Sequence, residues 1–105
     1  MKVKEAVELL RGIDPIGEIE LAALYHDELF KRAEMRWRSG KMPMAGFCTL
    51  LKEVNDWIVK VGIGVGMTEA RAKHLMRIFN EQVYTAAKMA LDGQSNQLNL
   101  LTNLP

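Results

Sequence analysis

Apolar residues recur at steps of three and four along most of this 105-residue chain, which is the spacing that lines one side of an α-helix. Glycine and proline interrupt the pattern at residues 12–15, 39–43 and 62–66. Such residues end helices, because proline lacks a backbone N–H and glycine loses more backbone freedom than any other residue on folding. The sequence therefore predicts an all-α fold, a small antiparallel bundle of about four helices.

Capping residues set the predicted bounds of the helices. Asp14 and Thr68 are favourable N-caps, and Pro15 is tolerated in a first helical turn. The glycines at 62–66 are expected to end the third helix, since repeated glycine disfavours a helix interior. In chain order the predicted helices cover residues 3–10, 14–38, 47–61 and 68–91.

The second predicted helix is apolar on more than one side. One side holds residues at steps of three and four, namely Ile19, Ala22, Ala23, His26, Phe30, Ala33 and Trp37. Leu21, Leu24 and Leu29 widen the apolar surface beyond this stripe. A helix of this kind needs neighbours on two sides, so we expect the chain to form a homo-oligomer.

The fourth predicted helix has one apolar side, which is expected to face inward and be buried; it is formed by Ala72, Leu75, Met76, Phe79, Val83, Ala86 and Ala90. The small residues near its end permit close approach of another helix. After Gly93 the chain is uncharged and rich in asparagine, glutamine and leucine. We therefore expect a helical domain over residues 1–92 and a non-helical tail over residues 93–105.

Composition excludes several classes of protein. Hydrophobic residues make up 49% and charged residues 26%, as in globular proteins, and no apolar run approaches the ~18–20 residues that a membrane helix needs. The N-terminal residues do not have the apolar block of a signal peptide. Cys48 is the only cysteine, so no internal disulfide can form. These features predict a cytoplasmic protein, in the host cytoplasm if it is viral.

The residue patterns of catalytic sites are missing, so we expect a protein that is not an enzyme and needs no cofactor or metal. Neither histidine belongs to a pair at the one-turn spacing of helical metal sites. His26 lies between Ala22 and Phe30 and is expected to be packed or at an interface, whereas His74 is expected to be solvated. The glycines at 62–66 lack the spacing of a dinucleotide-binding loop and the lysine of a P-loop.

Charge is distributed unevenly, although the net charge is only +1. Residues 1–30 hold three basic and seven acidic side chains, whereas residues 31–41 hold five basic and one acidic. This basic stretch, which includes a tryptophan, predicts contact with DNA or an acidic partner. The candidate contact residues are Arg32, Arg36, Trp37 and Lys41, extended by Arg71, Lys73 and Arg77 of the last helix. The alternative is that pairs such as Glu28–Arg32 only stabilise the helix.

The tail carries a short motif, Gln97-Leu98-Asn99-Leu100-Leu101. The motif resembles the pentapeptide by which bacterial replication and repair proteins bind the sliding clamp. The resemblance implies that Gln97 anchors through hydrogen bonds, while Leu100 and Leu101 enter an apolar pocket and Leu98 adds a further contact. The alternative is that the leucines pack on the bundle or on a sister subunit.

A second likeness covers residues 22–63. The run Ala23-Leu24-Tyr25-His26-Asp27-Glu28-Leu29 belongs to a long helix, which ends at the break formed by Arg36, Ser39 and Gly40 and is followed by a helix with Leu51-Lys52. This arrangement resembles the small terminase subunits of tailed phages. The resemblance implies a non-enzymatic subunit that oligomerises into a ring, binds viral DNA and presents it to a separate ATPase. The last helix and the tail have no counterpart in it.

Two functions follow from these patterns. The first is a helical, homo-oligomeric interaction protein of the small-terminase kind, an adaptor in DNA packaging. The alternative is a replication-associated regulator that docks on a partner such as the sliding clamp through its tail.

Overall fold

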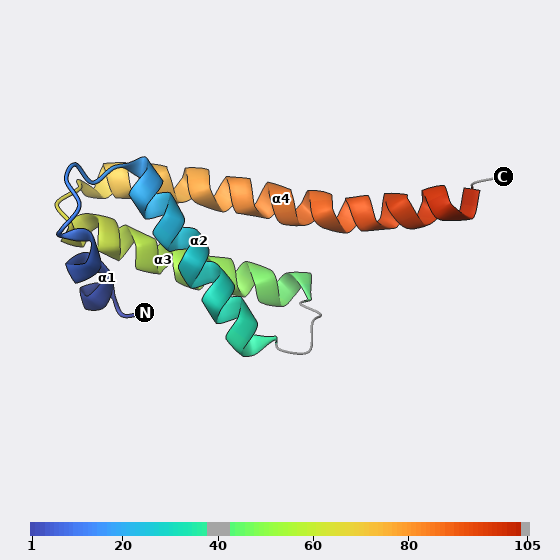
Figure 1. The fold of residues 1–105 in the computed structure, drawn as a ribbon, viewed down its shortest axis with the longest axis horizontal. Helices are drawn as coiled ribbons and strands as arrows, with labels where there is room; N and C mark the ends of the chain where they lie inside the picture. The colour runs from blue at the N-terminus through green and yellow to red at the C-terminus, as the bar shows by residue number, and fades with distance from the viewer. Residues whose placement is uncertain (38–42, 104–105) are drawn as a thin grey trace.

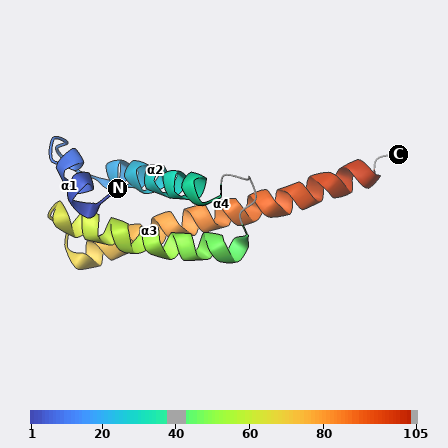
Figure 2. The ribbon, with the colours of Figure 1, turned by 90° about the horizontal axis from the view of Figure 1, so that it is seen from below.

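The computed structural model describes residues 1–37 and 43–103, with side chains described up to Ala90. Over these residues the chain is all-α, as predicted. Its four helices are α1 (Val3–Leu10), α2 (Glu18–Arg36), α3 (Met44–Gly64) and α4 (Glu69–Asn103). Helix α3 is central, since it packs against each of the other three, and α4 runs antiparallel to it (Figure 1). Figure 2 shows α1 and α2 on one side of the α3–α4 pair.

One apolar core joins the four helices. Its largest fully buried side chains are Leu21, Tyr25, Leu50, Val54, Val61, Leu75 and Phe79. Helix α1 adds Ala6, Val7 and Leu10. Helix α3 buries one side along much of its length, from Leu50 to Val61, because it packs against all three other helices.

Helix α2 begins later than the sequence predicted. The N-cap is Gly17, whose backbone N–H donates to the Glu20 carboxylate (N to Oε2, 2.9 Å). This bond satisfies one of the free N–H groups at the start of the helix. Asp14 and Pro15 lie in the linker before α2, so the prediction that they start the helix was wrong.

Helix α3 continues through two of the glycines that were expected to end it. Gly62 and Gly64 are helical, and the chain turns at Gly66, which has a φ of +101°. The Met67 N–H donates to the Gly62 carbonyl and the Gly66 N–H to the Ile63 carbonyl, both at 3.0 Å. This pair of bonds is the Schellman motif, which requires a left-handed residue that glycine adopts without strain.

Helix α4 starts as predicted, since Thr68 Oγ1 accepts the backbone N–H of Arg71 at 3.1 Å. The sequence predicted that this helix ends near Leu91 and that a non-helical tail follows. In the structure the helical backbone passes through Gly93 to Asn103. A single glycine costs a helix only about 1 kcal/mol, and no proline follows before the end of α4. The last part of α4 extends beyond the ends of α2 and α3 (Figure 1).

Only one of the apolar sides of α2 is buried. Its buried residues are Leu21, Leu24, Tyr25, Glu28 and Leu29. Ile19 and Phe30, which belong to the predicted stripe at steps of three and four, are 82% and 71% exposed. Both sides of this helix are apolar, but within the described chain its neighbours lie on one side only. The other side therefore faces solvent.

Candidate functional site

An apolar groove of about 650 Å³ lies between α2 and α4. Its lining comprises His26, Leu29, Phe30 and Ala33 of α2, Phe47 of α3, and Gln82, Val83, Ala86, Ala87 and Ala90 of α4. Only His26 and Gln82 are polar. This cavity, called the α2–α4 groove below, is therefore suited to an apolar partner surface rather than to an ion or a polar metabolite.

The groove exists because α2 and α4 both pack on α3 and touch each other little. Ala72, Leu75 and Phe79 of α4 are buried, as predicted. Ala86 and Ala90 were predicted to be buried too, but they are exposed, because α4 leaves the bundle near this point. Their small side chains leave the space between the helices open.

His26 forms part of the wall of the groove. The residue is half-buried, and its ring stands edge-on to Tyr25, with the ring centroids 6.0 Å apart. Tyr25 in turn packs on Phe79 in the core, at 5.5 Å between centroids. His26 is thus a packing residue in the structure, which agrees with the prediction from the sequence.

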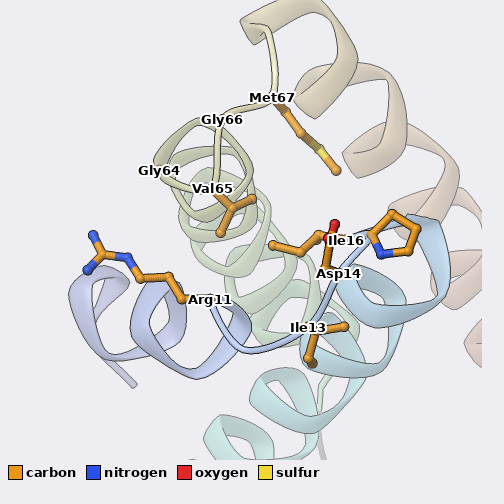
Figure 3. A pocket seen from close by; sticks show the side chains of 9 residues that line it. Arg11, Ile13, Asp14, Ile16, Gly64, Val65, Gly66 and Met67 are labelled. Carbon is orange, nitrogen blue, oxygen red and sulfur yellow. The ribbon is translucent and has the colours of Figure 1, made fainter.

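A second hollow of about 590 Å³ lies between the α1–α2 linker and the α3–α4 turn. Its lining consists of Arg11, Ile13, Asp14, Pro15, Ile16, Gly64, Val65, Gly66 and Met67. Figure 3 shows that Arg11 and Asp14, its two charged side chains, come from separate parts of the rim and do not point toward one another. This arrangement brings no nucleophile and base together, so the hollow does not have the residues of a catalytic site. The α2–α4 groove is therefore the stronger candidate, as a contact surface.

Two of the basic residues at the end of α2, Arg32 and Arg36, are held in ion pairs. Arg36 donates to the Glu53 carboxylate through both terminal nitrogens, at 3.1 and 2.7 Å. Arg32 donates from Nε to Glu28 at 2.9 Å, and its guanidinium lies 5.9 Å from the centroid of the Trp57 ring. The Glu28–Arg32 pair was predicted from the sequence. The partner of Arg36 was not, because Glu53 lies on another helix.

Glu28 is the one charged side chain that is buried in the part of the chain whose side chains are described. Burial raises the pKa of its carboxyl group, but hydrogen bonds from the Met1 amino group and Arg32, together with their positive charges, outweigh this effect and hold the pKa below the ordinary value of 4.5. Glu28 is therefore ionised at neutral pH and serves as a fixed anion between basic groups.

The other residues predicted to contact DNA are spread over the fold. Lys73 is paired with Glu69 at 2.8 Å, one turn earlier in α4. Arg71 and Arg77 are exposed on the same helix. Trp37 caps the C-terminus of α2 and packs on Gly46, where an added Cβ would lie 2.8 Å from its ring. Lys41 lies outside the described residues.

A chain of polar side chains crosses the bundle and was missed by the sequence analysis. The Tyr25 hydroxyl donates to Asn55 Oδ1 at 2.6 Å, and Asn55 Nδ2 donates to Asn80 Oδ1 at 2.9 Å. These three hydrogen-bonded side chains join α2, α3 and α4. Burial raises the pKa of Tyr25 to about 12. The only signal in the sequence was an asparagine within each of two apolar helices.

Metal binding and membrane insertion are two other functions on which the described residues bear. No group of three or more histidine, cysteine, aspartate or glutamate side chains among them lies close enough to hold a metal ion. Cys48 is half-buried and His74 is exposed. Within the described chain, no helix combines the length and the apolar character that crossing a membrane requires.

The tail motif lies on the last turns of α4. The side chains of Gln97, Leu98, Leu100 and Leu101 fall outside the described ones, so their role in binding a partner stays a prediction.

Comparison with known proteins finds no family model, no curated protein and no solved structure that matches the chain. The resemblances to small terminase subunits and to clamp-binding peptides therefore remain predictions from the sequence.

Proposed function

We propose that the protein is a non-enzymatic interaction protein that self-associates through the α2–α4 groove. The observation that carries this proposal is an open groove with almost wholly apolar walls and with Phe30, 71% exposed, at its edge. Contiguous apolar surface of this kind is unfavourable in water and marks an interface in soluble proteins.

A second copy of the chain is the partner that best accounts for this surface. Helix α2 leaves a further large apolar side chain in solvent, Ile19, which is 82% exposed. Every copy presents the same apolar faces, and a symmetric contact removes both sets from water at once. This agrees with the oligomer expected from an α2 sequence that is apolar on more than one side.

A role like that of small terminase subunits would add DNA binding to this proposal. Arg32, Arg36 and Lys73 lie in ion pairs, which favours Arg71 and Arg77 as the phosphate contacts. Binding of duplex DNA that weakens steeply with salt would support this role. Clamp docking is the alternative, and it would respond little to salt and would disappear when residues 94–105 are removed.

Self-association is tested by the mass of the protein in solution. At micromolar concentration we expect the wild type to sediment as a multiple of its 11.9 kDa chain. Phe30→Asp places a charge in the groove and should give the monomer mass. Met35→Asp is the matched control, because Met35 is equally exposed on α2 but does not line the groove. A monomeric wild type, or an oligomeric Phe30→Asp variant, would refute the proposal.

A further inference from the structure

We propose that pH controls self-association through the α2–α4 groove, and that His26 is the residue that senses the pH. The inference rests on the self-association proposed above and adds its regulation. Two copies associate while the His26 imidazole is neutral, and they separate when a proton makes it a cation. The sensor is part of the contact surface, so the proton acts directly on the association.

His26 is the one titratable side chain among the described residues that line the groove. The walls that α3 and α4 contribute are apolar, apart from Gln82, whose amide does not titrate. On α2 the neighbours one turn before and after His26 are Ala22 and Phe30. The charge of the groove therefore changes only when His26 gains or loses its proton.

The charged residues that adjoin the lining in sequence are exposed, and they do not belong to the lining. They are Asp27, Lys31 and Glu34 of α2 and Glu81 and Lys88 of α4. Glu28 is buried, but its carboxylate accepts hydrogen bonds from the Met1 amino group and Arg32. Tyr25, which stands edge-on to the His26 ring, is a neutral phenol, because burial raises the pKa of Tyr25 to about 12. The described lining thus offers no carboxylate to stabilise an imidazolium.

Histidine is the side chain that ordinarily changes its charge between pH 5.5 and 7.5. The sequence has two, His26 and His74. His74 is exposed and does not line the groove, so association through the groove leaves it in water. Next to the α3 wall, after Phe47, lies Cys48, and thiols ordinarily keep their protons over this range. A response of the association to pH is therefore assigned to His26.

The groove is open in one copy, and His26 is half-buried there, so water reaches part of the ring. A second copy that fills the groove replaces this water with apolar atoms. An imidazolium without water or a carboxylate is strongly disfavoured, whereas a neutral ring is disfavoured far less. Association therefore requires the neutral ring: it is favoured above the ordinary titration point of an imidazole, about pH 6.5, and is lost as the pH falls through this value.

Sedimentation of the full chain at pH 7.5 and 5.5 tests the inference. A solvated imidazole is about 10% protonated at the first pH and about 90% at the second. The dissociation constant of a dimer should therefore rise by about tenfold for each of its two histidines, on the order of 100-fold in all. In His26→Gln the ratio of the two constants should fall to about one, whatever the constant is at pH 7.5. His74→Gln is the matched control and should keep the wild-type ratio.

Two further measurements separate a sensor from a residue that only packs. In proton NMR, with the His74 signal identified by its loss in His74→Gln, the His26 signal should titrate at a lower pH in a concentrated sample than in a dilute one. The His74 signal should titrate at the same pH in both samples. Circular dichroism at 222 nm should show the same helical content at pH 7.5 and 5.5, because the proton separates the copies without unfolding them.

Each other outcome overturns a defined part of the scheme. A wild type that associates equally at both pH values would overturn the control by pH and leave the proposed self-association standing. An unchanged pH response in His26→Gln, a His26 signal that does not shift with concentration, or a loss of helix at pH 5.5 would remove His26 as the sensor. If the wild type sediments as a single chain of 11.9 kDa at pH 7.5, both the inference and the proposed function fail.

Discussion

Gly64 lies closer to α1 than any residue with a side chain could. A Cβ added there would stand 2.6 Å from Val7 Cγ2, and one added at Gly62 would stand 3.0 Å from Ala72 Cβ. At the scale of single residues, these glycines set how near α1 and α4 come to α3. Their role is close packing inside the helix, and Gly66 alone supplies the turn.

Substitution of Gly64 by alanine should therefore destabilise the fold. Alanine favours a helix interior over glycine by about 1 kcal/mol, but overpacking costs typically 1–3 kcal/mol, so we expect a net loss of about 1 kcal/mol. Val7 is β-branched and cannot rotate freely out of the way. The measurement is the midpoint of urea unfolding.

Two further variants show whether the contact is the cause. Gly12→Ala should leave the midpoint nearly unchanged, because no atom lies within 4 Å of its added Cβ. Combining Gly64→Ala with Val7→Ala should lose less stability than the sum of the single changes. A Gly64→Ala variant that is more stable than the wild type would contradict the packing role.

At the scale of helices, the chain Tyr25–Asn55–Asn80 fixes α2, α3 and α4 in one register. Apolar contacts alone permit neighbouring helices to slide or rotate at modest cost. A buried polar group tolerates such movement poorly, because it loses its hydrogen-bond partner. The polar chain therefore selects the side of α2 that faces the core.

Tyr25→Phe should affect stability in two ways, by removing the hydrogen bond to Asn55 and by removing a phenol that ionises at high pH. At neutral pH the variant should be less stable by about 1 kcal/mol, because Asn55 loses its donor. The raised pKa of Tyr25, about 12, means that the unfolded phenol ionises from about pH 10 while the folded one stays neutral. Folding stability is thus lost between pH 10 and 12 in the wild type, and the variant should lose less over that range. Urea unfolding at pH 7, 10 and 11 measures the difference; parallel losses in the two proteins would contradict it.

The sequence predicted the helices better than the contacts between them. Apolar spacing located all four helices, and the Thr68 cap located the start of α4. The rotation of α2 was not predictable from its own residues, because Ile19 and Phe30 lie on one apolar side and Leu21 and Leu29 on another. Which side is buried depends on the shape of α3 and α4. The groove depends on the same rotation, so it was missed although Phe30 and the alanines of α4 were noted.

At the scale of the whole molecule, the protein is a bundle at one end and a single helix at the other. Its Cα trace extends 58 Å along one axis and 24 and 22 Å along the other two. An elongated shape of this kind leaves much of α4 in solvent in one copy. Association of two copies that covers part of this surface should therefore stabilise the folded chain.

Thermal unfolding should accordingly depend on protein concentration. Association stabilises the folded state by mass action, and a hundredfold rise in concentration contributes about 2.7 kcal/mol for each dimer. For chains of this size we expect Tm to rise by roughly 5–10 °C between about 1 and 100 µM. Circular dichroism at 222 nm follows the transition. Phe30→Asp, which places a charge in the groove, should abolish the dependence. Met35→Asp, which lies outside the groove, should keep it. A Tm that is the same at both concentrations in the wild type would show that the protein does not associate over this range, which would contradict the proposed self-association.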